Sequence, residues 1–316
     1  MEDILIVLSK IFYIVILFAS GIIAKKFRLL SDKGEEDLSK IFTDFFWPAL
    51  IFFSITSKLN RADIVDNVSL PFLAVLTGLV GFLFGFLFIK IFKFKDDERK
   101  IFLFHSVFNN FSFMVLPFAV MFLPEKGAGL LFISNTGFIV LIWTLGVFIL
   151  NATSTKRDML LKLLSPGLIV TVLSIVIVLA DVNKFIPQMF FDITETLGSP
   201  TIPIAMMITG ARIYKLGVKS LKFNFWNITL GILRLVLIPA VLFFTGLFFK
   251  NVVRLNKEVL IIFMLVNIMP VSVNSVTMAI SYKSNADLAS EGVVFTHLFS
   301  IITVTIYVIL IRKFFV

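Results

Sequence analysis

The sequence of 316 residues contains no cysteine and only two histidines, His105 and His297. The lack of cysteine excludes disulfides, iron–sulfur clusters, thiolate zinc sites and cysteine nucleophiles. Two histidines supply too few ligands for a histidine-rich metal or catalytic site. Acidic side chains are also scarce, because the 39 phenylalanines outnumber the 20 Asp and Glu residues together. We therefore expect neither a cofactor nor a metal.

Apolar residues dominate the composition. They make up 59% of the chain, charged residues make up 16%, and the mean hydropathy is +1.02. Soluble domains carry roughly 45–50% apolar and about 25% charged residues, and a water-soluble fold has too little interior for such a surplus. The composition predicts a membrane protein and excludes a soluble enzyme. The net charge of +9 does not indicate a nucleic-acid partner, because the basic residues lie in short loops between apolar runs.

Ten hydrophobic runs follow one another along the chain, and about 20 residues of helix cross a bilayer. The runs lack the polar and apolar alternation of barrel strands. The seventh run is interrupted by Asp192, Glu195, Pro200 and Pro203. The expected fold class is an all-α polytopic membrane protein with ten transmembrane helices. Their approximate limits are 5–24, 41–56, 70–89, 101–123, 129–150, 166–180, 190–211, 223–249, 259–280 and 292–311.

The basic residues predict the orientation of these helices. Ten spans divide the loops into two sets on opposite sides of the membrane. Of the 29 Lys and Arg residues, 18 lie in loops that follow odd-numbered spans, and nine lie in the other loops and at the termini. Because basic residues accumulate in cytoplasmic loops, the odd loops are expected in the cytoplasm. Both termini are then extracytoplasmic, in a multi-pass protein of the cell membrane.

The spacing of prolines indicates an internal repeat. Pro48 and Pro203, in helices 2 and 7, are 155 residues apart, and Pro117 and Pro270, in helices 4 and 9, are 153 apart. Five helices per half is an odd number, so the second half enters the membrane from the opposite side. We expect a five-plus-five inverted repeat, with helices 1–5 in residues 1–150 and helices 6–10 in residues 151–316. Coincident spacing of kink prolines is the alternative, but the order of helix types agrees as well.

Helices 4 and 9 each place polar residues and a proline at mid-membrane depth. Proline removes an amide donor and clashes with the carbonyl four residues earlier, which breaks the helix and exposes a half-helix amino end. Asparagine can hold a ligand without burying a charge. The alternative is that these residues only bond neighbouring helices. The candidate substrate-binding residues are Asn109, Asn110, Pro117, Asn135, Asn267, Pro270 and Asn274.

Two charged side chains inside helices are candidates for ion coupling or counter-charge. Asp44 lies about 6 Å from Pro48 along helix 2, at 1.5 Å per residue, and an intramembrane carboxylate is a candidate proton or cation site. Alternatively, it pairs with Lys40 near the interface. Arg234 is suited to attract an anion or to neutralise Asp44, and a structural role is the alternative. His105 is expected to be a hydrogen-bonding residue near the membrane surface.

Four segments have a recognisable pattern: FFWPALIFFSIT around Pro48, NFSFMVLP from Asn110 to Pro117, SPTIPIAMMITGARI in helix 7, and IMPVSVNSVTMAISYKSNADLASEGVVF from Ile268 to Phe295. In these segments the chain resembles bacterial members of the auxin efflux carrier family, which is related to the plant auxin exporters. The resemblance covers nearly the whole chain. It implies ten helices with both termini outside, helices 4 and 9 crossing at their prolines beside the substrate, and an elevator-like cycle.

The resemblance also implies a domain division and a function. Helices 1, 2, 6 and 7 would form a scaffold with a homodimer contact, and helices 3–5 and 8–10 a moving transport domain. The expected function is secondary transport of a small organic anion, a mono- or dicarboxylate such as an auxin-like acid, malate or malonate. A proton- or sodium-coupled importer and a ligand sensor without transport stay open. The lack of paired His, Cys or Asp argues against an intramembrane enzyme.

Overall fold

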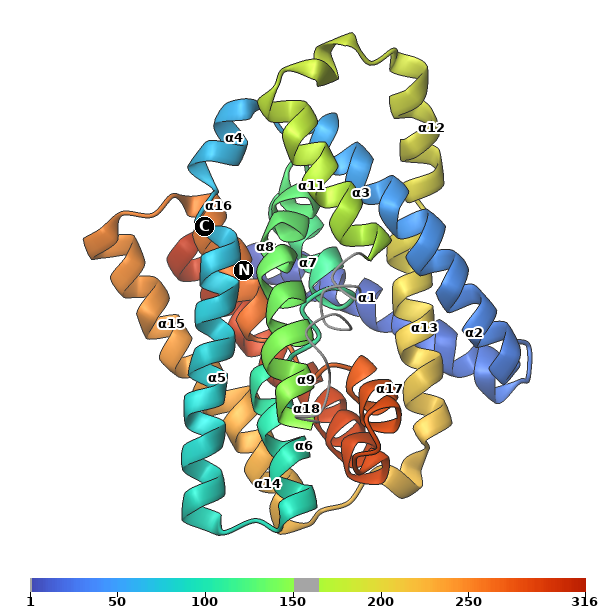
Figure 1. Cartoon of the computed structure of the whole chain (residues 1–316), viewed down its shortest axis with the longest axis vertical. Coiled ribbons are helices and arrows are strands. Elements are labelled where there is room, and N and C mark those ends of the chain that lie inside the picture. The colour runs from blue at the N-terminus through green and yellow to red at the C-terminus, as the bar shows by residue number, and fades with distance from the viewer. Residues whose placement is uncertain (1, 151–164) are drawn as a thin grey trace.

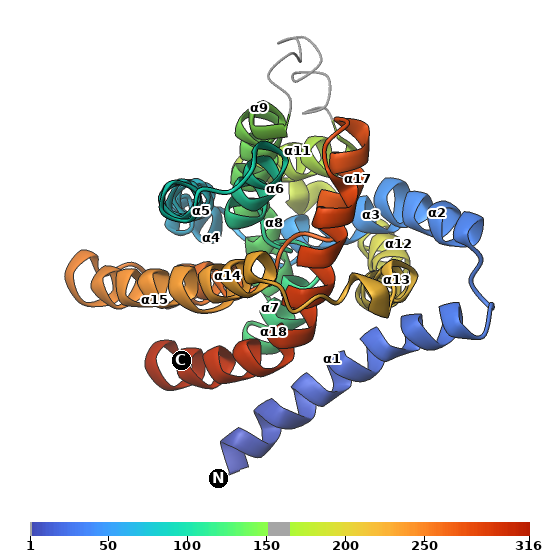
Figure 2. The ribbon, with the colours of Figure 1, turned by 90° about the horizontal axis from the view of Figure 1, so that it is seen from below.

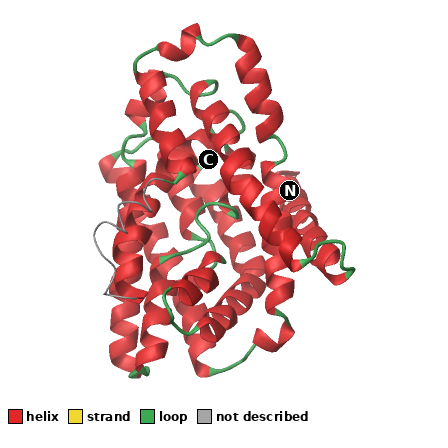
Figure 3. Ribbon diagram, turned by 45° about the vertical axis from the view of Figure 1, so that its right-hand side comes forward, coloured by secondary structure: helices red, strands yellow, loops and turns green. Residues whose placement is uncertain are grey.

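The computed structural model describes residues 2–150 and 165–316, and these are helical apart from short connections (Figure 3). Within these ranges the pairing of Asn109 with Val271 is an isolated bridge, outside any strand. The expected boundary between the two halves, at residues 150 and 151, lies at the edge of the described ranges. Three of the basic residues counted for the orientation lie outside these ranges, at positions 156, 157 and 162. An all-helical chain is what the apolar runs predict.

The helices before residue 151 include one broken span. The segments α2, η1 and α3 join into one continuous helix, and so do α8, η2 and α9, whereas α6 and α7 are separated by residues 108–114. The elements are α1 (Glu2–Lys26), α2 (Asp32–Ile41), η1 (Phe42–Phe46), α3 (Trp47–Thr56), α4 (Arg61–Asp66), α5 (Leu70–Phe92), α6 (Asp96–Val107), α7 (Val115–Phe122), α8 (Gly127–Leu141), η2 (Ile142–Gly146) and α9 (Val147–Leu150).

The helices after residue 164 include two broken spans, between α12 and α13 and between α16 and α17. The elements are α11 (Pro166–Leu179), η3 (Val182–Phe185), α12 (Gln188–Gly198), α13 (Thr201–Leu216), η4 (Val218–Ser220), α14 (Phe225–Ile232), η5 (Leu233–Leu237), α15 (Ile238–Phe248), η6 (Phe249–Val253), α16 (Lys257–Asn267), α17 (Asn274–Ser281) and α18 (Ala286–Phe315).

Five helical stretches of the described chain are long and apolar enough to cross a membrane. They are Asp32–Thr56, Arg61–Phe92, Gly127–Leu150, Phe225–Val253 and Ala286–Phe315. The broken spans are not among them, because a break divides each into helices of 16 residues or fewer. The structure therefore supports a polytopic membrane protein, while ten spans and the inverted repeat stay predictions.

Packing joins helices that are far apart in the sequence. The helix α1 lies at the outside of the molecule and packs chiefly on α13, while α3 packs on α11 and α12 (Figures 1 and 2). The backbones of α1 and α13 approach closely through glycine, because a Cβ added to Gly21 would lie 1.9 Å from the Met207 carbonyl oxygen. Elsewhere, α5 packs on α6 and α8, and α16 packs on α7, α8, α15 and α18.

Candidate functional site

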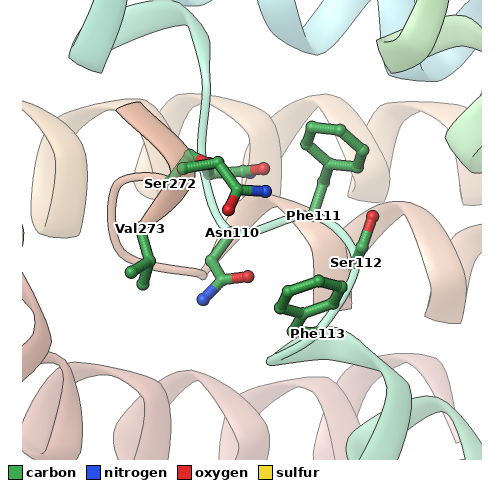
Figure 4. Close-up of a pocket in the computed structure, with 8 residues that line it drawn as sticks. Asn110, Phe111, Ser112, Phe113, Ser272 and Val273 are labelled. Carbon is green, nitrogen blue, oxygen red and sulfur yellow. The ribbon is translucent and has the colours of Figure 1, made fainter. Parts of the chain in front are cut away.

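The break between α6 and α7 and the break between α16 and α17 meet inside the protein. Phe108–Met114, between α6 and α7, is extended or turned, and so is the segment between α16 and α17. The amide of Asn110 donates to the Pro270 carbonyl at 2.8 Å, and the amide of Ser272 donates to the Phe108 carbonyl at 3.1 Å. Figure 4 shows these two segments lying against each other. Two backbone hydrogen bonds thus join the broken helices at their crossing.

The prolines account for the breaks in different ways. Pro270 cannot donate to the carbonyl four residues earlier, that of Val266. The Val266 oxygen accepts instead from the Asn109 Nδ2 at 2.6 Å and from the Met269 amide at 3.5 Å. Pro117 lies in the first turn of α7, where an amide has no helical partner in any case. There its ring stops α7 from extending back through Phe113. Both prolines therefore act by interrupting the backbone hydrogen bonds of their helices.

Arg234 lies fully buried behind the crossing. Its guanidinium donates to the carbonyls of Met269 at 3.2 Å, Ser106 at 3.4 Å and Asn267 at 3.1 Å. These oxygens lie at or just beyond the carboxyl ends of α6 and α16, where helix dipoles place partial negative charge. The two helix ends thus stabilise a cation inside the protein, and the printed bonds of Arg234 do not reach Asp44, which is exposed on η1. The coupling and counter-charge roles of both residues stay predictions.

A polar cavity of about 50 Å³ lies at the crossing, lined by residues 109–113 and 272–274. This volume holds a few water molecules or one group the size of a carboxylate. The amino ends of α7 and α17 begin at its edge, so their partial positive charges favour an anion there. Of the predicted site residues, Asn109, Asn110 and Asn274 line this cavity.

His297 of α18 fixes the buried Asn110 side chain. The His297 Nδ1 lies 2.9 Å from the Val293 carbonyl, which can only accept, so Nδ1 carries the proton. Its Nε2 is then an acceptor for the Asn110 Nδ2, 3.4 Å away. This role of His297 was not expected from the sequence. A polar residue within an apolar membrane helix does, however, mark a candidate functional position.

Two of the other predicted residues, Asn135 and Asn267, do not line the cavity. Asn135 of α8 donates from Nδ2 to the Ser112 Oγ at 3.2 Å, and Asn267 donates to the Phe263 carbonyl at 2.7 Å. Within the described chain, the side-chain oxygens of Asn109, Asn135 and Asn267 are buried without a hydrogen-bond partner. Unpaired buried acceptors are costly. Of these three asparagines, Asn109 lines the cavity, where a ligand or water can complete its bonding.

His105 is a hydrogen-bonding residue, as expected. It is fully buried in α6, and its Nε2 lies 2.9 Å from the Ser275 Oγ of α17. This contact could not be predicted from the sequence, because it joins residues 170 positions apart across the crossing. His105 therefore ties the amino-terminal half of one broken helix to the carboxyl-terminal half of the other.

The outer helices border the crossing in two different ways, by an aromatic contact on one side and by a cavity on the other. On one side Trp47 of α3 contacts Phe113 and Phe132, with ring centroids 5.6 and 5.0 Å apart, and fills the space between α3, the break and α8. On the other side an apolar cavity of about 690 Å³ lies between α1, α13 and α18, and His297 and Met114 line its inner end. The Asn110–His297 pair therefore stands between the polar and the apolar cavity.

Arg212 is a cation that sequence analysis placed in a loop. The expected end of helix 7 was Ala211, but α13 continues to Leu216, so Arg212 lies on a helix. Its Nη1 donates to the Asn274 Oδ1 at 2.8 Å, at the rim of the polar cavity. Among the described residues, no group of three or more His, Asp or Glu side chains is placed to hold a metal ion.

The sequence matches a known protein family and a known relative along nearly its whole length. A model of a family described as membrane transport protein matches residues 6–308. An uncharacterized transporter of Methanocaldococcus jannaschii is 27% identical over 309 residues, which cover 96% of this chain and 98% of that protein. The residues matched by the family model include α6, α7, α13, α16 and α17.

Proposed function

The chain belongs to the membrane transport protein family of the auxin efflux carrier type, and from this premise we propose that it is a secondary transporter of a small organic anion. The proposed binding site is the polar cavity at the crossing. The observation that carries the proposal is the bonded pair of breaks, which brings the amino ends of α7 and α17 to one cavity. Opposed amino ends with neutral amides are suited to a carboxylate, because they stabilise negative charge without a buried counter-ion.

The size of the two cavities favours one class of anion. The polar cavity accommodates only the carboxylate group, whereas the apolar cavity, at about 690 Å³, has the volume of a whole small-molecule site. Its lining is apolar apart from a few side chains such as Thr209, Tyr214 and His297. A monocarboxylate with an apolar body therefore fits better than a dicarboxylate, whose second charge would lie against apolar side chains.

The packing supports an elevator-like movement in which α5–α9 and α14–α18 shift against α1–α3 and α11–α13. Contacts within each of these groups are more extensive than the contacts of α1 and α13 with α18 or of α3 and α11 with α8. The boundary between α1, α13 and α18 is largely apolar, and sliding would break the Arg212–Asn274 hydrogen bond beside it. A homodimer held by the scaffold helices is part of the same proposal.

We infer uncoupled export rather than coupled import. A monovalent anion that leaves a cell with a negative interior gains about 2.3 kcal/mol per 100 mV, so export needs no second ion. Import would need a cation site, and the candidate carboxylate, Asp44, is exposed and lies outside the polar cavity.

Flux into and out of proteoliposomes tests the proposal, with labelled benzoate and labelled malonate as probes at a clamped membrane potential. Asn110→Ala and Asn274→Ala should each lower benzoate affinity, because a lost hydrogen bond to a charged group costs about 1.5–3 kcal/mol. Asn251→Ala, on the exposed surface of η6, is the matched control. Equal benzoate affinity in all three variants would contradict the site. Flux that follows a proton or sodium gradient but ignores the potential would favour the importer, and binding without flux would favour a sensor.

A further inference from the structure

Arg212 stands where three helices meet beside the polar cavity. It lies near the end of α13, its neighbours Glu35 and Ser39 lie on α2, and Asn274 is the first residue of α17. About 24% of its side chain is exposed. The guanidinium thus reaches from the outer helices to a residue that lines the proposed binding site.

Both terminal nitrogens of Arg212 are bonded to neutral oxygens. Nη1 donates to the Asn274 Oδ1 at 2.8 Å, and Nη2 donates to the Ser39 Oγ at 3.2 Å. The nearby carboxylate of Glu35 approaches only Nε, at 3.7 Å, which is longer than a hydrogen bond. The fork of the guanidinium, which matches two carboxylate oxygens, therefore faces no carboxylate.

The neighbouring carboxylates are bonded to other cations. Lys25 lies 2.7 Å from both Glu35 and Asp32, and Lys215 lies 3.5 Å from Asp32. Three cations and two carboxylates make up this cluster, so it carries one positive charge in excess. Since the lysines meet the carboxylates directly, the excess charge resides chiefly on Arg212.

We propose that Arg212 binds the carboxylate of the transported anion. The two carboxylate oxygens replace the Asn274 and Ser39 oxygens on Nη1 and Nη2. This exchange is favourable because a bidentate pair with a carboxylate has charge-assisted bonds, roughly twice as strong as neutral ones. The inference rests on the proposed function and deepens it, since it assigns the residue that distinguishes an acid from its uncharged analogue.

The position of Arg212 confines this contact to one stage of transport. Arg212 belongs to the outer helices, whereas Asn274 belongs to the group proposed to move. The guanidinium therefore meets the anion only while α17 lies against α13, as it does in this structure. Arg212 recognises the anion in the conformation seen in this structure and does not move with it across the membrane.

Binding of benzoate and of benzamide, its uncharged isostere, tests the proposal in purified full-length protein in nanodiscs. Arg212→Gln should lower benzoate affinity about tenfold or more, the effect of a lost charged hydrogen bond, and leave benzamide affinity unchanged. Arg212→Lys, which keeps the charge but loses the fork, should have an intermediate effect. Lys215→Gln removes a charge from the same helix and cluster, away from the cavity, and is the matched control.

A second measurement uses the absence of cysteine from the natural sequence. Arg212→Cys introduces a single thiol, which 2-aminoethyl methanethiosulfonate converts into a cationic side chain and methyl methanethiosulfonate into a neutral one. Benzoate affinity should recover with the cationic reagent alone. This comparison is made on one folded preparation, so it does not depend on the stability of the glutamine variant.

The outcomes separate the two proposals. Unchanged benzoate affinity in Arg212→Gln, or equal recovery with both reagents, would overturn the role of Arg212 while leaving the crossing as the site. Equal loss of benzoate and benzamide binding in Arg212→Gln would also overturn it, because the residue would then only shape the cavity. If the wild-type protein neither binds nor transports benzoate or malonate, the proposed function fails, and the role of Arg212 fails with it.

Discussion

Replacement of Arg234 by methionine should loosen the crossing of the broken helices. Arg234 donates to the carbonyls of Ser106, Asn267 and Met269, and methionine has a similar length but no donor. Three hydrogen bonds to a charged group contribute roughly 4.5–9 kcal/mol at about 1.5–3 kcal/mol each. Removing a buried charge recovers several kcal/mol of its desolvation cost. We therefore expect a net loss of about 3 kcal/mol, a large part of a typical stability of about 5–15 kcal/mol.

The loss should be local, because the three carbonyls belong to the ends of α6 and α16. Hydrogen exchange in nanodiscs measures it at the amides of Asn110 and Ser272, which form the two bonds between the breaks. Both amides should exchange about 100-fold faster in Arg234→Met, the factor that 3 kcal/mol implies. Arg61→Met, on the exposed surface of α4, is the control. Unchanged exchange at both amides would refute the account of Arg234 as the cap of the two helix ends.

Three further predictions concern the ends of the molecule and its charges. A tag fused after Val316 should be reachable only from outside the cell, and one inserted after Lys95 only from inside; the reverse would overturn the orientation. Asp44→Asn should leave anion flux in proteoliposomes unchanged, and abolished accumulation would make it a coupling site. The Asp63 carboxylate, 2.6 Å away, raises the pKa of Lys126 above its usual 10.5 through a hydrogen bond. The stabilisation by this pair should therefore be complete at neutral pH and decline only as the pH rises through that raised pKa, and thermal unfolding of Lys126→Met between pH 7 and pH 11 measures the difference.

The sequence predicted the all-helical fold and the breaks near Pro117 and Pro270, because both follow from local chemistry. Apolar runs require helices in a bilayer, and Pro117 and Pro270 each remove a backbone donor wherever they lie. Asn109, Asn110 and Asn274 line one cavity, and their role in substrate binding stays a prediction. The family assignment was confirmed by the match over residues 6–308.

The contacts that complete the site could not be predicted, because they join distant parts of the chain. Asn110 and His297 are 187 positions apart, and Arg212 and Asn274 are 62 apart. Arg212 was misplaced for a simpler reason. The end of helix 7 was set where the apolar run stops, whereas α13 continues for five residues past Ala211 and presents its cation from a rigid helix. Boundaries read from hydropathy alone thus misassign charges near helix ends.

The two backbone bonds between the breaks have a thermodynamic consequence. They fasten the walls of the polar cavity to each other, so in the proposed elevator-like movement the cavity would keep its shape. A cavity of constant shape would contribute the same intrinsic binding free energy from either face of the membrane. The net direction of an uncoupled carrier would then be set by the membrane potential and the two concentrations. Such a carrier runs in reverse as readily as forward once those gradients are inverted.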